Sequence, residues 1–105
     1  MKPKLSREDC IKLYNRIIRT IKNPEVNFYI KKLKGIMGFC EWSSGITVDY
    51  RKEFISTLIH ECIHYIEPNW NETTVLYAEK RVINALTPMQ IIKLLTVFVK
   101  RFNKS

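Results

Sequence analysis

Long apolar runs are absent from this 105-residue chain, and cysteine and histidine are scarce. No stretch reaches the roughly 18 consecutive apolar residues that a membrane-spanning helix needs. The opening residues MKPKLSRED are charged and lack the apolar segment of a secretory signal. The three cysteines, Cys10, Cys40 and Cys62, form no CxxC pair and are odd in number, so no disulfide framework is implied. We therefore expect a single domain in a reducing, cytoplasmic setting, with no membrane partner.

Acidic residues are also few, and their distribution is uneven. The chain has 18 Lys and Arg against 10 Asp and Glu, for a net charge of +8, which would ordinarily indicate a nucleic-acid partner. However, the segment from Glu53 to Glu79 holds five glutamates and no lysine or arginine. A region kept free of positive charge suits a cation site, and a phosphate-binding surface would avoid it.

Helical periodicity and capping signals predict four helices. Ser6 followed by Asp9 is the pattern of a capping box and starts a helix over Arg7 to Lys22, which Asn23-Pro24 should end. Thr87-Pro88-Met89-Gln90 is a second strong start signal. The three further helices are expected over 52–66, 71–86 and 88–102.

The segment between Val26 and Tyr50 has a different pattern, with β-branched and aromatic residues broken by glycine and serine. It predicts strands at VNFYIKKLK, GIMGFCEW and ITVDY, with SSG as a hairpin turn. The expected fold is α+β: an N-terminal helix, a small three-stranded and mainly antiparallel sheet, a histidine-bearing helix, a glutamate-bearing helix and an amphipathic C-terminal helix. An edge of such a sheet can accept an extended peptide.

Both histidines lie in the segment TLIHECIHYIEPNWNE, residues 57–72. At about 100° per residue, they lie on neighbouring turns and about 140° to 180° from the centre of the apolar side of their helix. Two such imidazoles can ligate one zinc ion at about 2.0–2.1 Å. Glu61, between His60 and His64, would stand beside the metal, where it can hold a water molecule and take its proton. The pattern predicts a zinc site.

A catalytic zinc ion usually has three protein ligands, and with no other histidine the third is expected to be a carboxylate, with a cysteine as the less favoured alternative. Glu72 and Glu79 share the apolar arc of the following helix, two turns apart, and an acid there needs a partner. We favour Glu72, with Glu79 as the alternative, and expect the other acid to hold a ligand histidine or an arginine. A competing interpretation is that Asn69-Trp70-Asn71-Glu72 is a capping box. Cys62 is expected to be a small core residue.

HECIH at 60–64 with a downstream glutamate resembles the zincin metallopeptidases, specifically the gluzincin branch. The chain's size and order of elements over 27–86 resemble the minigluzincins and, more distantly, the SprT-like peptidases. The resemblance implies that His60, His64 and Glu72 are zinc ligands and that Glu61 is the general base and acid. It also implies that substrate binds in extended form to a strand within Gly38 to Tyr50. One departure is Leu76, where thermolysin-like gluzincins have an acid four residues after the ligand glutamate.

These observations favour a zinc-dependent endopeptidase whose partner is an extended peptide or protein. Our hypothesis is that the helix over 88–102 limits access to the cleft and leaves the enzyme weakly active or latent. One rival function is a small basic nucleic-acid-binding protein that uses Lys12, Arg16 and Arg19 on one helix face. The other is a zinc-stabilised interaction module without turnover.

Overall fold

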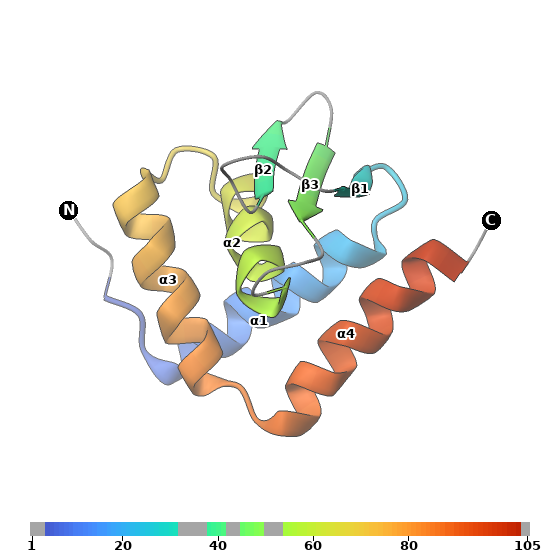
Figure 1. Ribbon diagram of the computed structural model, residues 1–105. Coiled ribbons are helices and arrows are strands. Elements are labelled where there is room, and N and C mark those ends of the chain that lie inside the picture. The colour runs from blue at the N-terminus through green and yellow to red at the C-terminus, as the bar shows by residue number, and fades with distance from the viewer. Residues whose placement is uncertain (1–3, 32–37, 42–44, 50–53, 104–105) are drawn as a thin grey trace.

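The computed structural model describes residues 4–31, 38–41, 45–49 and 54–103. These residues form four helices and three short strands, so the chain has the expected α+β class and is mostly helical (Figure 1). In chain order the elements are α1 (Arg7–Lys22), β1 (Phe28–Lys31), β2 (Gly38–Glu41), β3 (Gly45–Asp49), α2 (Phe54–Ile66), α3 (Glu72–Ala85) and α4 (Pro88–Asn103).

The start and end of α1 confirm the sequence prediction. The Ser6 hydroxyl accepts a hydrogen bond from the Asp9 backbone N–H at 3.1 Å, and the Ser6 backbone N–H donates to the Asp9 carboxylate at 3.0 Å. This reciprocal pair is the capping box, and it satisfies donors that the first turn would otherwise leave unpaired. The inner face of α1 is buried along its length, from Cys10 to Ile21.

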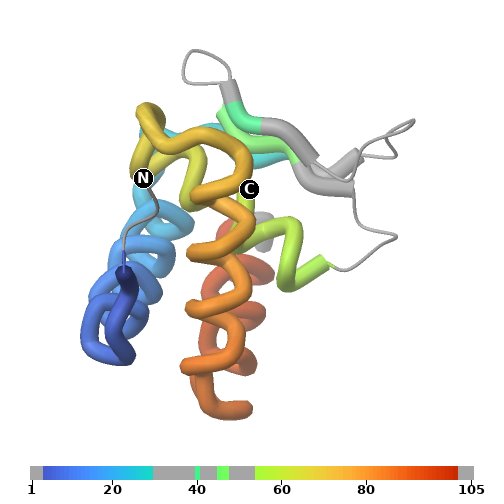
Figure 2. Tube along the Cα trace, turned by 90° about the vertical axis from the view of Figure 1, so that its left-hand side faces the viewer, coloured from blue at the N-terminus to red at the C-terminus, as the bar shows by residue number. Residues whose placement is uncertain are grey.

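Helix α2 is the central element, because it packs against α1, α3, β2 and β3. Its buried apolar side chains, Leu58, Ile59, Cys62 and Ile63, join one core cluster with residues of all the other helices. Cys62 is fully buried, so its predicted role as a core residue is confirmed. The ribbon view and the tube view both place the sheet at one end of the molecule, with the helices extending away from it (Figures 1 and 2).

The sheet differs from the prediction in one of its two pairings. Its strand order is β1-β3-β2: β2 pairs with β3 in antiparallel fashion, as expected, but β1 pairs with β3 in parallel. A mainly antiparallel sheet was therefore the wrong expectation. β1 and β3 can run in the same direction because the chain between them includes β2 and is long enough to reverse twice. The predicted SSG turn lies mainly outside the described residues.

Gly45 explains how β3 can begin so close to β1. Its φ angle is +114°, and a Cβ atom there would stand 2.3 Å from the Asn27 carbonyl oxygen. The next backbone N–H, of Ile46, donates to that same oxygen at 2.8 Å. Only glycine permits both the backbone conformation and this approach.

Helix α4 is anchored in the core and tied to the end of α1. Leu94 and Phe98 are buried, and the Phe98 ring packs edge-on against Phe54 with ring centroids 5.2 Å apart. The Arg101 guanidinium donates to the Ile21 carbonyl at 2.9 Å, and also to those of Asn23 and Val26. Arg101 therefore satisfies backbone acceptors at and just beyond the end of α1.

Within the described part of the chain, no single helix is long and apolar enough to cross a membrane. Helices α3 and α4 meet that test by length and composition only when taken together. The two helices are bent by 116° at the break between them. Figure 1 shows them as a V-shaped pair.

Candidate metal centre

The two histidines lie side by side on α2 and face α3 rather than open solvent. The centroids of the His60 and His64 rings are 4.8 Å apart, as expected for neighbouring turns of a helix. Only 12% of the His60 side chain and 24% of the His64 side chain are exposed. Buried leucine and isoleucine side chains on the opposite side of α2 fix the helix rotation that presents both rings to α3.

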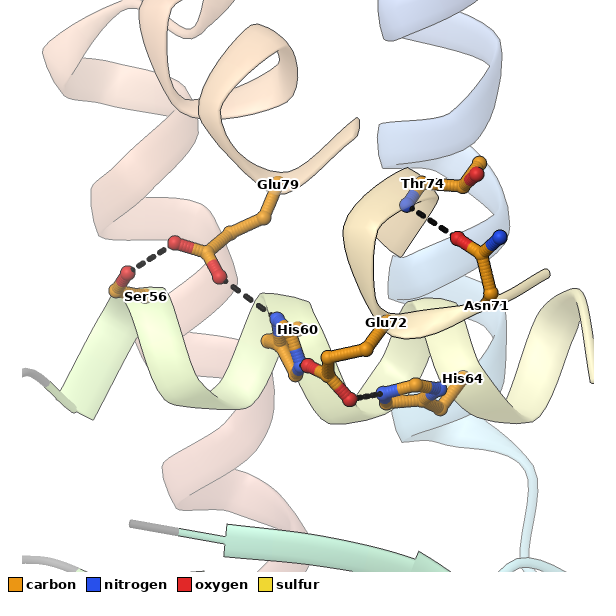
Figure 3. A network of polar contacts seen from close by, with 7 residues as sticks. All are labelled: Ser56, His60, His64, Asn71, Glu72, Thr74 and Glu79. Carbon is orange, nitrogen blue, oxygen red and sulfur yellow. Dashed lines mark hydrogen bonds and ion pairs between the residues drawn. The ribbon is translucent and has the colours of Figure 1, made fainter. Parts of the chain in front are cut away.

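Glu72, the first residue of α3, reaches both rings with one carboxylate. Its Oε1 lies 2.5 Å from His60 Nε2, and its Oε2 lies 3.1 Å from His64 Nε2 (Figure 3). One ligand atom from each of these three side chains can be chosen so that all lie within 4.8 Å of one another. The structure therefore brings together the three residues that the sequence analysis selected as ligands.

The local cap of α3 leaves the Glu72 side chain free for this role. Asn71 is the N-cap residue, and its side-chain oxygen accepts a hydrogen bond from the Thr74 backbone N–H at 2.8 Å (Figure 3). The proposed capping box from Asn69 to Glu72 was therefore wrong, because the helix begins two residues later than that interpretation requires. Glu72 occupies the first helical position, and its carboxylate points toward the histidines.

Glu79 holds the other nitrogen of His60. Its Oε1 lies 2.8 Å from His60 Nδ1, and its Oε2 accepts a 2.5 Å hydrogen bond from the Ser56 hydroxyl. Figure 3 shows Glu79 and Glu72 approaching the His60 ring from different sides. The Glu79 oxygens contact Ser56 and His60, so Glu79 is the acid that holds a histidine, the role expected for whichever glutamate is not the third ligand.

Hydrogen bonds and nearby charges shift the pKa values of His60 and Glu79 in opposite directions. Burial opposes the charged form of His60, but the hydrogen bond to Glu79 and the negative charges of Glu61 and Glu72 outweigh it, so the pKa of His60 lies above its ordinary value of 6.5. Burial alone would raise the pKa of Glu79, yet the hydrogen bonds from His60 and Ser56 keep it below its ordinary value. A carboxylate oxygen thus lies close to each ring nitrogen of His60, an arrangement that favours the protonated form of the ring.

Glu61 is buried on α2, with 6% of its surface exposed. Burial, together with the negative charges of Glu72 and Glu79, raises its pKa to about 7, against the opposing effect of His60. A carboxyl group that titrates near neutral pH can both accept and return a proton. Glu61 lies between His60 and His64 in the sequence, and its charge interacts with those of His60, Glu72 and Glu79. It therefore lies close to the candidate metal centre.

Sequence reasoning missed Ser56, which extends the chain of hydrogen bonds from His60 through Glu79. A signal was present, because Ser56 precedes His60 by four residues and so lies on the same face of α2. Cys62 takes no part in the site: it is fully buried, and burial raises the pKa of its thiol.

Comparisons of the chain with protein-family models, with curated proteins and with solved structures find no match.

Proposed function

We propose that this chain is a zinc-dependent metallopeptidase of minimal size, with His60, His64 and Glu72 as the metal ligands. The observation that carries the proposal is the convergence of two imidazole Nε2 atoms on one carboxylate. Two neutral nitrogen donors and one carboxylate are a ligand set found in catalytic zinc sites, which keep one position open.

The side chains fit such an ion in both distance and charge. Tetrahedral ligands at about 2.0–2.1 Å from zinc stand roughly 3.3 Å apart. The candidate ligand atoms lie within 4.8 Å of one another, so side-chain adjustment alone can close the set. The Glu79 carboxylate at His60 Nδ1 favours the ring tautomer with a proton on Nδ1, which leaves Nε2 as the metal donor.

A zinc ion held there would polarise a substrate carbonyl and lower the pKa of a coordinated water to about 7. Glu61 takes a proton from the attacking water and transfers it to the nitrogen that leaves as an amine. Glu79 and Ser56 keep the His60 ring in place during this exchange.

The sheet supports binding of an extended peptide at one edge. Within the Gly38 to Tyr50 segment expected to receive substrate, β3 is paired on both sides, whereas β2 forms an edge of the described sheet. β2 also packs against α2, the helix that carries the histidines. We therefore assign the substrate strand to β2, where backbone groups can pair with an added strand.

The proposed latency through the C-terminal helix receives no support from the packing. α4 packs against α1, and the hydrogen-bond partners of the site histidines come from α3. Deleting α4 would also remove Leu94 and Phe98 from the core. A truncated chain would therefore test folding rather than latency.

The proposal is tested by combining metal analysis with a peptide assay. Purified protein should contain about one zinc ion per chain and cleave a quenched fluorescent peptide library. His64→Ala should lose both properties. Glu61→Gln should keep the zinc ion and lose cleavage by a factor on the order of 10² or more. Glu67→Gln, a change at an acid of the same segment, serves as the matched control.

The outcomes separate this proposal from its rivals. A wild-type protein without bound metal would remove the proposal altogether. Zinc binding without cleavage by either wild type or Glu61→Gln would favour the non-catalytic zinc module.

A further inference from the structure

The outward face of α4 carries apolar side chains that nothing in the described structure covers. Met89, Ile92 and Val99 are 71%, 53% and 53% exposed. At 100° per residue they share one arc of about 120° with Thr96, Lys93 and Lys100. We call these six residues the α4 outer face. Thr96 donates its hydroxyl to the Ile92 carbonyl at 2.8 Å, so its polar group is satisfied within the helix.

The lysines lie on one side of this arc and the apolar residues on the other. Going around the helix, the order is Val99, Ile92, Thr96, Met89, Lys100 and Lys93. Both lysines are exposed. An apolar strip with lysines beside it is typical of a helix that rests in the interface of a lipid bilayer.

Positive charge extends beyond α4 onto the helix against which it packs. Residues 10–24 hold four lysines and arginines without an acid, and residues 80–105 hold six without an acid. These two stretches contain most of α1 and all of α4, which are in contact. The acidic side chains of the candidate metal centre lie on α2 and α3, whereas the lysines of the outer face lie on α4.

An open cleft of about 800 Å³ lies between the end of α1 and α4. Its lining combines cationic with apolar side chains, including Lys22, Lys93, Lys100, Ile21, Pro24 and Val97. The two α4 lysines therefore belong both to the outer face and to the cleft. A phosphate group between lysine ends, with an apolar chain beside it, matches this lining.

We propose that the α4 outer face binds the surface of an anionic phospholipid bilayer. The apolar side chains enter the boundary between head groups and acyl chains, and Lys93 and Lys100 meet lipid phosphates at the mouth of the cleft. The sequence led us to expect no membrane partner because no segment spans a bilayer. Binding at the surface requires no span.

Two other occupants fit the face less well. A nucleic-acid backbone would use the lysines but gains nothing from three exposed apolar side chains. In a dimer formed through this face, Lys93 and Lys100 of one copy would lie against those of the other, and both copies are strongly basic. Repulsion between like charges opposes this arrangement. An anionic bilayer satisfies the charged and the apolar halves of the face at once.

The experiment measures sedimentation of the full chain with phosphatidylcholine vesicles, with and without phosphatidylglycerol. Wild type should bind only when phosphatidylglycerol is present. Lys93→Gln with Lys100→Gln should lower the partition coefficient roughly 25-fold, about fivefold for each lysine. Met89→Ser, Ile92→Ser and Val99→Ser together should lower it roughly tenfold or more.

The control carries matched changes on α3, Leu76→Ser with Lys80→Gln, at exposed positions. It should bind vesicles as wild type does. Because all the changed residues are exposed, thermal unfolding and zinc content should stay at wild-type values, and Ile92→Ser alone provides a milder variant. Equal vesicle binding by wild type and the apolar variant would overturn the proposal. So would tighter binding to a duplex oligonucleotide that depends on the lysines alone.

Discussion

His60 differs from His64 because both of its ring nitrogens have carboxylate partners. Glu72 lies at Nε2 and Glu79 at Nδ1, whereas His64 contacts Glu72 alone among the described hydrogen bonds. When one ring nitrogen of a histidine binds a metal ion, a carboxylate hydrogen-bonded to the other ring nitrogen fixes the ring orientation. It also increases the basicity of the nitrogen that binds the metal. The two histidines are therefore expected to contribute unequally to metal affinity.

Replacing Glu79 with Gln should weaken zinc binding by roughly 10- to 100-fold. The amide oxygen can still accept the Nδ1 hydrogen bond, but its lack of charge lowers the basicity of the His60 ring. Competition with a chromophoric chelator measures the affinity, and Glu25→Gln, the same chemical change at an exposed acid outside the helices, is the control. Ser56→Ala should have a smaller effect in the same direction. Unchanged zinc affinity in Glu79→Gln would mean that this carboxylate does not support the ligand.

At this scale, the sequence identified the histidine pair from local spacing, whereas the preference for Glu72 over Glu79 had no such local basis. The i, i+4 spacing alone places His60 and His64 on neighbouring turns, because both belong to one helix. Choosing between Glu72 and Glu79 depends on how α3 crosses α2, which no local pattern specifies. Ser56 was missed for the same reason, since its partner Glu79 lies 23 residues away.

At the scale of elements, the capping box at Ser6 links the stability of α1 to pH. The hydrogen bond from the Ser6 backbone N–H, followed by that with the Ser6 side chain, holds the pKa of Asp9 below its ordinary value of 3.8. A carboxyl group with a lowered folded-state pKa adds stability above the unfolded pKa and loses it as pH falls through the folded value. The contribution of Asp9 is therefore complete at neutral pH and lost in acid.

Asp9→Asn should accordingly lower the thermal midpoint of the metal-free protein at pH 7, while the difference from wild type should shrink as pH falls below the ordinary value of 3.8 and through the lowered folded-state pKa. Circular dichroism in the presence of EDTA measures both midpoints across this range. Glu25→Gln, which removes an exposed acid outside the helices, is the control. A difference between Asp9→Asn and wild type that persisted unchanged into acid would contradict the charged capping box.

Helices were easier to predict than strand pairing for a related physical reason. The signals for α1 and α4 are local: Ser6 caps through Asp9, and Thr87 accepts from the Gln90 backbone N–H at 3.2 Å. Each bond closes within three residues, so the sequence contains all of its determinants. The parallel pairing of Phe28 with Ile46 joins residues 18 positions apart and depends on the route of the chain between them.

At the scale of the whole molecule, the metal centre joins two helices that the core already holds together. Among the described residues, eighteen buried hydrophobic side chains from α1, α2, α3, α4, β3 and the segment around β1 form a single cluster that includes none of the proposed ligands. The Glu72 carboxylate contacts both histidines and so adds a polar link between α3 and α2. We therefore expect the metal-free chain to stay folded, unlike small domains in which zinc replaces the core.

Zinc should nevertheless raise the unfolding temperature, because its three ligands lie on two helices and come together only in the folded state. Free zinc at about 1,000 times its dissociation constant would add about 4 kcal/mol to the free energy of unfolding. For a domain of about 100 residues, this corresponds to a rise in the midpoint of roughly 15–30 °C. Calorimetry with zinc and with EDTA measures the rise.

His64→Ala should unfold near the wild-type EDTA midpoint under both conditions, because it lacks one ligand. If wild type and His64→Ala gained equally from zinc, the ion would be bound elsewhere, and the arrangement of α2 against α3 would have to be explained without it.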